Sequence, residues 1–230
     1  MERIGFIGSY DKKDLLLNIA KVLTSLNNRV LIIDATSMQR FRYIVPKVSQ
    51  NNNYTYISEY QGIDVALGFM HIEEIENYIG KEKFESDFVF IDSDNIQTIT
   101  SFEFDSIKKI YFVTSYDIYE VQRAMEILKM IKEPSTIEIT KVILSSDMSS
   151  SQDKYLNHLL SETNVKVQKD NIEFADTVED KKANLENQLI KEIRIKPYTS
   201  TYKYSLEYIT ASIADGMIKQ EEIRRIIRKI

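Results

Sequence analysis

Five short, almost wholly apolar runs recur along the chain, and they constrain its fold more than any other feature. The runs are continuous rather than alternating, which indicates strands buried on both faces, as in a parallel sheet. Helical periodicity follows most of the runs, so strands and helices alternate along the chain. We therefore predict an α/β fold of three layers, with a mostly parallel central sheet between helices and right-handed crossovers. The runs are Arg3–Gly8, Arg29–Asp34, Asp87–Asp92, Lys109–Thr114 and Lys141–Leu144.

Apolar residues recur at helical spacing in several segments between and after these runs. The predicted helices are Leu15–Leu26, His71–Ile79, Ile118–Ile131, Lys154–Leu160 and Tyr202–Ile213. The segment Thr36–Gly68 has no clear period, so we expect it to be irregular, with a turn at Asn51–Asn53 and one strand near Tyr54–Ile57. After Val165 the sequence becomes charged and weakly periodic.

The chain has 230 residues, the length of one α/β domain. No linker or low-complexity tract divides it, and we assign residues 1–216 to a single domain. Asp215 and Gly216 are expected to end a helix, because glycine is the favoured residue just after a helix C-terminus. Residues 217–230 then form a separate, amphipathic C-terminal helix.

The composition argues against several classes of protein. The net charge of −5 disfavours general binding to nucleic acid, and the absence of cysteine excludes disulfides, thiolate metal sites and thiol catalysis. No stretch approaches the roughly 20 apolar residues of a membrane-spanning helix. The chain starts with a strand rather than a signal sequence, so we expect a cytoplasmic protein.

The turn after the first strand lies where a nucleotide-binding α/β protein keeps its phosphate loop. Such a loop needs glycines that let the backbone wrap the anion, a lysine, and a hydroxyl residue that holds magnesium. Gly8 and Ser9 open the turn, and Lys12 falls at the lysine position when the sequence is counted back from Asp34. Lys13 then stands where the hydroxyl residue belongs.

The order of these elements resembles the MinD/ParA family of deviant P-loop ATPases over roughly residues 1–145. The likeness rests on the first strand and helix, on the strands ending at Asp34 and Asp92, and on Tyr111–Thr114 followed by the segment 115–124. In that family the strand-end aspartate similar to Asp92 contacts magnesium through water. The members are ATP-dependent dimers that position division sites, plasmids, flagella, pili or secretion machines. The resemblance thus implies a P-loop NTPase-like fold and a homodimer.

The departures from the family pattern predict that hydrolysis is lost. Asp11 replaces the glycine before the lysine, and its carboxylate would repel phosphate. The family's signature lysine falls on Ile7, and the second acidic residue of its Ile-Asp-x-Asp strand end falls on Thr36. Without these groups, the turn is better suited to a structural role at the start of a helix, where acidic residues favour the helix dipole.

We interpret the chain as a non-hydrolysing scaffold or positioning factor for pilus, secretion, division or partition machinery, with no catalytic residue. The TadZ-like proteins of pilus-assembly systems are a candidate branch. The expected cofactor is none, or ATP with magnesium bound weakly at Asp92 and its neighbours. The residues of this weak or vestigial nucleotide site are Gly8, Ser9, Lys12, Lys13, Asp34 and Asp92.

Two other interpretations stay open. The chain could be an active ATP-binding switch in which Lys12 and Lys13 together neutralise the phosphates and Asp92 holds the metal. It could also be a DNA-associated partition accessory, which requires a basic surface stripe. Basic residues cluster chiefly in the last helix and in Lys191–Lys196, which is a thin footprint for that role.

The last helix presents isoleucines on one face and basic residues on the other. Such a helix can lie on an anionic membrane surface, pack on a partner, or pack on its own chain. We therefore predict contact with a protein partner, with peripheral contact with the inner membrane face as a further option. Independently of this helix, the resemblance and the missing loop glycines predict a homodimer formed through the loop after Gly8 and the region after Asp34. The residues of this membrane or partner helix are Ile223, Arg224, Ile226, Ile227 and Ile230.

Overall fold

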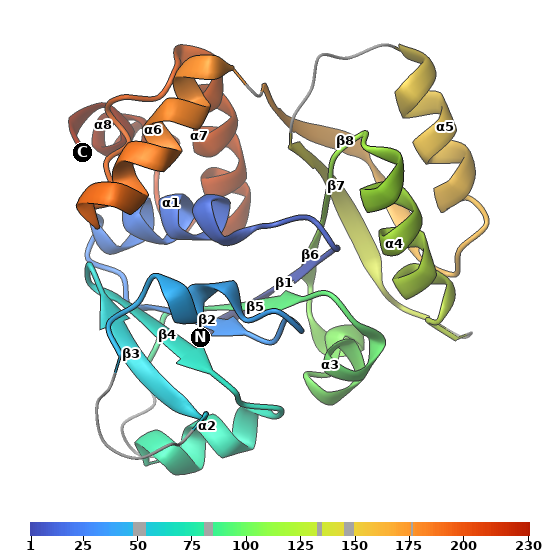
Figure 1. Cartoon of the computed structure of the whole chain (residues 1–230), viewed down its shortest axis with the longest axis horizontal. Coiled ribbons are helices and arrows are strands. Elements are labelled where there is room, and N and C mark those ends of the chain that lie inside the picture. Colours follow the sequence, from blue (N-terminus) through green and yellow to red (C-terminus); the bar gives the residue numbers. More distant parts are fainter. Residues whose placement is uncertain (48–53, 81–84, 133–134, 145–149, 176) are drawn as a thin grey trace.

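A computed structural model describes residues 1–47, 54–80, 85–132, 135–144, 150–175 and 177–230. Its centre is an eight-stranded sheet in the order β3-β4-β2-β5-β1-β6-β7-β8 (Figure 1). All pairings are parallel except β3 with β4, which confirms the predicted α/β fold with a mostly parallel sheet. The strands are β1 (Glu2–Ile7), β2 (Val30–Asp34), β3 (Tyr56–Tyr60), β4 (Ile63–Leu67), β5 (Phe88–Ser93), β6 (Lys109–Thr114), β7 (Glu138–Leu144) and β8 (Lys166–Phe174).

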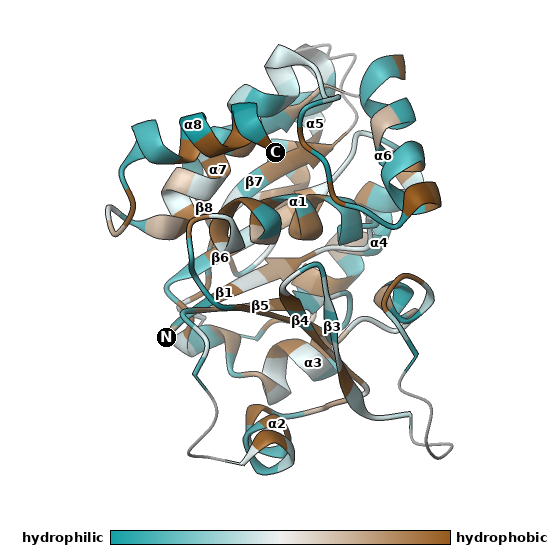
Figure 2. Cartoon of the chain, turned by 90° about the vertical axis from the view of Figure 1, so that its left-hand side faces the viewer, coloured by the Kyte–Doolittle hydropathy of each residue, from teal (hydrophilic) through white to brown (hydrophobic). Residues whose placement is uncertain are grey.

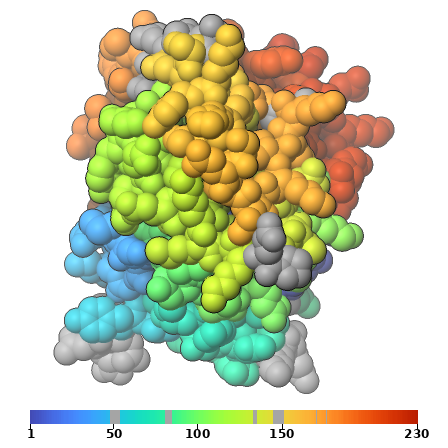
Figure 3. Space-filling view, turned by 90° about the vertical axis from the view of Figure 1, so that its right-hand side faces the viewer, coloured from blue at the N-terminus to red at the C-terminus, as the bar shows by residue number. Residues whose placement is uncertain are grey.

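Helices cover both faces of the sheet, which gives the three layers that the sequence predicts. One face carries α1 (Lys13–Thr24), α6 (Val178–Ile190), α7 (Ser200–Ala214) and α8 (Gln220–Lys229). The other carries α2 (Ile72–Ile79), α3 (Ile96–Ser101), α4 (Ile118–Lys129) and α5 (Ser150–Leu160). Figure 2 shows the central strands coloured as hydrophobic between these layers. Figure 3 shows α4 and α5 side by side on the second face.

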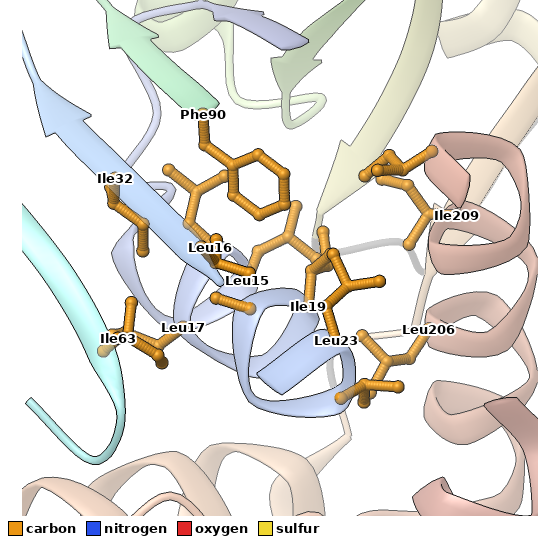
Figure 4. Close-up of a cluster of buried hydrophobic side chains, with 14 of the residues drawn as sticks. Leu15, Leu16, Leu17, Ile19, Leu23, Ile32, Ile63, Phe90, Leu206 and Ile209 are labelled. Carbon is orange, nitrogen blue, oxygen red and sulfur yellow. The ribbon is translucent and has the colours of Figure 1, made fainter. Parts of the chain in front are cut away.

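The helix α1 is the centre of the first hydrophobic layer (Figure 4). Leu16, Ile19 and Leu23 are fully buried, and they pack between the sheet and α7. Because α1 follows directly on the candidate phosphate loop, this packing fixes the end of the loop against the sheet. The positive φ angles of Asp215 and Gly216 end α7 where the sequence predicts a stop.

The structure corrects the sequence-based description in the least periodic segments. Between Thr36 and Gly68, the region predicted to be irregular holds a hairpin of β3 and β4, joined by a turn at Gln61 and Gly62 with positive φ. The predicted turn at Asn51–Asn53 lies outside the described residues. Past Val165, the charged segment forms the edge strand β8 and the helix α6.

Candidate functional site

The carboxyl ends of three neighbouring strands bring the candidate site together. Asp34 at the end of β2 is in register with Asp92 on β5, and β1 runs along the other side of β5. The loop from Gly8 to Lys12 leaves β1 at this edge and enters α1. The structure thus places the sequence-predicted residues Gly8, Lys12, Asp34 and Asp92 in one cluster, where ligands bind in open parallel sheets.

Lys12 points into the protein rather than out of the loop. Its side chain is 1% exposed, and its Nζ lies 3.0 Å from Oδ1 of Asp92, whose side chain is 5% exposed. The same ammonium donates hydrogen bonds to the carbonyls of Gly8 and Tyr10. The loop therefore encloses the ammonium group of the chain's own Lys12, which lies against the carboxyl of Asp92.

Burial raises the pKa of the Asp92 carboxyl to about 7, the ion pair with Lys12 opposes the rise, and the nearby Asp34 adds to it. Burial also raises the pKa of Asp34. Asp34 is nonetheless well bonded, because Oδ1 accepts from the backbone and hydroxyl of Thr36 and Oδ2 accepts from the backbone of Phe41. Asp34 thus acts as a cap for the segment that follows β2.

Lys13 is held by acidic neighbours on the other side of the loop. Its Nζ lies 2.9 Å from Oδ2 of Asp11 and 3.2 Å from Oδ2 of Asp14. Arg40 also pairs with Oδ2 of Asp11, at 2.8 Å. Burial acts to raise the pKa of Asp11, but the bonds from Lys13 and Arg40 outweigh it, so that the pKa is lowered. Asp11 therefore stays ionised in the loop, where a phosphate would have to lie.

Gly8 and Ser9 are fixed by contacts across the sheet. Gly8 has a φ of +146°, and a Cβ at this position would lie 2.0 Å from the carbonyl oxygen of Val113. The hydroxyl of Ser9 donates to both the carboxylate and the backbone carbonyl of Glu120 on α4. Both residues are thus explained by packing and hydrogen bonds within the chain.

Two cavities lie beside the loop. The cavity between Lys12, Asp34 and Asp92 has a volume of about 30 Å³, which leaves room for little more than a water molecule. The cavity on the α6 side is larger, about 370 Å³. Its charged lining consists of one basic side chain, Arg40, and four acidic ones, which are Asp11, Asp14, Glu120 and Asp180.

These observations do not fit a bound ATP with magnesium. A triphosphate needs donors and positive charge that converge on open space, whereas both lysines of the loop already pair with carboxylates and the space beside Lys12 is small. Lys13 offers no hydroxyl for a metal ion. Among the described residues, no group of three or more His, Cys, Asp or Glu side chains could hold a metal ion.

The isoleucines of α8 face the protein interior. Ile223 and Ile227 are buried, and Ile226 and Ile230 are partly buried against the same hydrophobic layer. Arg224 pairs with Glu207 of α7 at 2.8 Å. The apolar face predicted for a membrane or a partner is thus covered by the chain's own helices in this structure. No described helix is long and apolar enough to cross a membrane.

Sequence reasoning missed the side chains that close the site. Arg40 lies in a segment without periodicity, and Glu120 belongs to a helix more than a hundred residues away in sequence. Asp94 accepts from the backbone and hydroxyl of Ser37, and so ties the segment after β2 to the end of β5. The only available signal was the excess of acidic residues near the strand ends.

Comparison with solved structures identifies the fold. A ParA family ATPase from Chlorobium tepidum superposes with a TM-score of 0.59 at 13% identity, covering 90% of this chain and 97% of that one. The chain has the fold of the ParA and MinD ATPases. MinD in the MinC:MinD complex of Aquifex aeolicus gives a TM-score of 0.59 at 14% identity, covering 94% and 96%. MinD from Pyrococcus horikoshii, complexed with Mg-ADP, superposes with a TM-score of 0.57 at 13% identity, covering 97% of this chain and 98% of that one.

The match to the ParA/MinD fold spans nearly the whole of each chain compared, so the fold carries no large addition or loss. At such low identity the likeness shows the fold alone. No protein-family model matches the sequence, and no curated protein matches it either. The chemistry of the site therefore has to be argued from its own residues.

Proposed function

We propose that this chain is a ParA/MinD-like scaffold that positions a cellular assembly through protein contacts and does not hydrolyse nucleotide. The observation that carries the proposal is the ion pair between Lys12 and Asp92, buried under a loop whose carbonyls accept from the same ammonium. Lys12 would have to leave Asp92 before it could reach a phosphate, and Asp92 would then be buried without a counter-ion.

The second line of support is the charge of the surroundings. Asp11 stays ionised inside the loop, and the cavity of about 370 Å³ beside it has a mainly acidic charged lining. A triphosphate that entered this region would meet repulsion rather than the converging donors of a phosphate site. Nucleotide control is thereby removed, while the surfaces of the fold remain available for partners.

The partners we propose are proteins, including a second copy of the chain that meets the first through the loop after Gly8 and the segment after Asp34. Solved relatives of the fold include a MinD bound to MinC, which shows that the fold can present a protein-binding surface. The assembly that is positioned could belong to a pilus, a secretion system, the division apparatus or a partition system, with the TadZ-like proteins as the candidate branch. Contact with a membrane through α8 would require that helix to separate from α1 and α7.

Isothermal titration calorimetry with ATP and magnesium tests the proposal. We expect no binding heat and no phosphate release from the unmodified chain. Lys13→Ala is the informative variant, because it removes a loop cation and leaves the buried pair of Lys12 and Asp92 intact. Micromolar ATP binding that Lys13→Ala abolishes would support the active-switch alternative and overturn the scaffold.

A further inference from the structure

The outward face of α6 carries an apolar stripe with no partner in the described part of the chain. We define the outer stripe as Val178, Lys182, Leu185 and Leu189. The three apolar members are 79%, 66% and 82% exposed, in chain order. At 100° per residue the four side chains fall within a sector of about 60°. Single exposed apolar residues are common, but three aligned on one helix face mark an interaction surface.

The stripe does not result from a loosely attached helix. The opposite face of α6 is buried through Asp180, Ala183 and Asn187. Asp180 accepts hydrogen bonds from the backbone and hydroxyl of Thr199, at 2.8 and 2.9 Å, and Asn187 donates to the carbonyl of Arg194 at 2.9 Å. These bonds fix the rotation of the helix, so the outer stripe is held towards solvent at the periphery of the molecule (Figure 2).

We propose that the outer stripe binds the same stripe of a second copy, with the two α6 helices antiparallel about a two-fold axis. The axis passes between positions 183 and 184, the midpoint of the stripe. Val178 then packs on the partner's Leu189, and Lys182 lies over the partner's Leu185. Such an isologous contact is complementary to itself, because each side chain of the stripe meets a different member of the same set.

The charges of the stripe select this orientation. Lys182 and Glu186 lie on the same side of the helix, with Nζ and Oε1 3.7 Å apart. In the antiparallel pair, Lys182 comes next to the partner's Glu186, so two opposite-charge pairs close the middle of the contact. In the antiparallel pair, Lys182 lies about 1.5 Å along the helices from the partner's Glu186 and about 4.5 Å from the partner's Lys182. A parallel pair would place Lys182 level with the partner's Lys182 and about 6 Å from the partner's Glu186. The antiparallel pair therefore brings opposite charges closer together than like charges.

This self-contact goes beyond the proposed function, because it does not use the loop after Gly8. The surface is small compared with a standard protein interface, so the affinity of one contact is expected to be weak. A chain with two different isologous contacts, one at the loop and one at α6, forms an open row of subunits rather than a closed dimer. Such a row is a suitable form for a scaffold.

Cysteine crosslinking tests the geometry, since the natural chain contains no cysteine. In the full chain, Lys182→Cys lies near the axis and is expected to form a disulfide with its own copy on mild oxidation. Val178→Cys or Leu189→Cys alone should not, because the two copies lie about 16 Å apart along the helices. The double variant Val178→Cys/Leu189→Cys should crosslink. Tyr204→Cys, at a 68% exposed position of α7, is the control for random collision.

Crosslinking of Val178→Cys or Leu189→Cys alone, or of Lys182→Cys no faster than Tyr204→Cys, would overturn the antiparallel contact. Sedimentation velocity gives the second measurement. We expect Leu185→Glu/Leu189→Glu to raise the dissociation constant of self-association at least about tenfold over Tyr204→Glu. Wild-type chain that stays monomeric at the highest soluble concentration would also overturn it. Neither result depends on the nucleotide calorimetry, so the two proposals fail separately.

Discussion

The loop after β1 and the helix α6 line the same cavity, yet they depart from the usual distribution of side chains in opposite ways. The loop buries the ammonium of Lys12 against Asp92 of β5, whereas α6 exposes the apolar side chains of Leu185 and Leu189. The buried groups face each other within the chain, with Nζ of Lys12 3.0 Å from Oδ1 of Asp92. The exposed apolar groups have no such compensation in the described chain. The contrast teaches that an interaction site is better located by groups left unsatisfied than by a motif's position.

The largest effect should come from breaking the buried pair. Lys12→Met removes the ammonium and leaves Asp92 in the interior without a counter-ion. At a pH well above 7, where the carboxyl has to ionise, we expect the free energy of unfolding to fall by about 3 to 5 kcal/mol. Urea denaturation followed by circular dichroism measures it. The double variant Lys12→Met/Asp92→Leu should recover most of the loss, because apolar groups then replace both charges. A loss below about 1 kcal/mol for Lys12→Met would show that water reaches the pair.

The next largest effect is expected at a buried apolar residue of α8, in contrast to the exposed apolar residues of the outer stripe. Ile223→Ala on α8 leaves a cavity beside α1 and α7, and the free energy of unfolding should fall by about 2 to 4 kcal/mol. The same denaturation experiment checks it, with Arg225→Ala on the exposed face as the control. If Ile223→Ala costs less than about 1 kcal/mol, α8 is not docked on the domain in solution.

The pH dependence of stability sharpens the description of the loop. Folding raises the pKa of Asp92 from 3.8 to about 7, so the native state binds more protons than the unfolded state between these values. The contribution of the protonated Asp92 carboxyl to the free energy of unfolding is therefore lost as the pH rises from about 4 to about 7. Asp92→Asn has no titrating group at this position. As the pH rises from about 4 to about 8, its free energy of unfolding should therefore increase by more than about 1 kcal/mol relative to that of the wild type.

Parallel stability curves for wild type and Asp92→Asn would contradict that expectation. They would mean that the ion pair with Lys12 keeps Asp92 charged throughout the range. Three other charged groups that interact with Asp92 in the wild type are present in both proteins. They are Asp34, Asp94 and the more distant Arg40.

The smallest effect on stability is expected at the outer stripe itself. Leu189→Gln changes a side chain that is 82% exposed, so the free energy of unfolding should change by less than about 0.5 kcal/mol. The same variant should weaken self-association in sedimentation velocity. A loss of several kcal/mol would show that Leu189 packs within its own subunit, and the contrast between loop and helix would then disappear.

The central strands of the sheet could be predicted from the sequence because they are buried on both faces. Continuous apolar runs such as Val30–Asp34 and Phe88–Ser93 have no other ready explanation. The convergence of Asp34, Asp92 and Lys12 also followed, since the carboxyl ends of parallel strands meet at one edge. The direction in which Lys12 points did not follow, because it depends on the carboxylate of Asp92 and on two loop carbonyls.

The elements that escaped prediction are stabilised by something other than apolar periodicity. The edge strand β8 is exposed along much of its length and carries charge. The hairpin strand β4 is an exception, because its residues Ile63 and Val65–Leu67 are apolar and buried, but it is short and lies in a segment without a clear period. The inward side of α6 includes Asp180 and Asn187, which are held by hydrogen bonds. Its outward side carries the leucines, so the usual pattern of an amphipathic helix is inverted there.

Gly8 has a consequence for tracing distant members of this fold. The carbonyl of Val113 leaves no space for any other residue at the end of β1, whatever the chain binds. A glycine retained there records crowding between two strands, and it should not be counted as a trace of ancestral chemistry. Asp11 and Lys13 carry different information, because charge pairing with Arg40 and Asp14 and the bond from the backbone N–H of Lys13 to Asp11 hold their side chains.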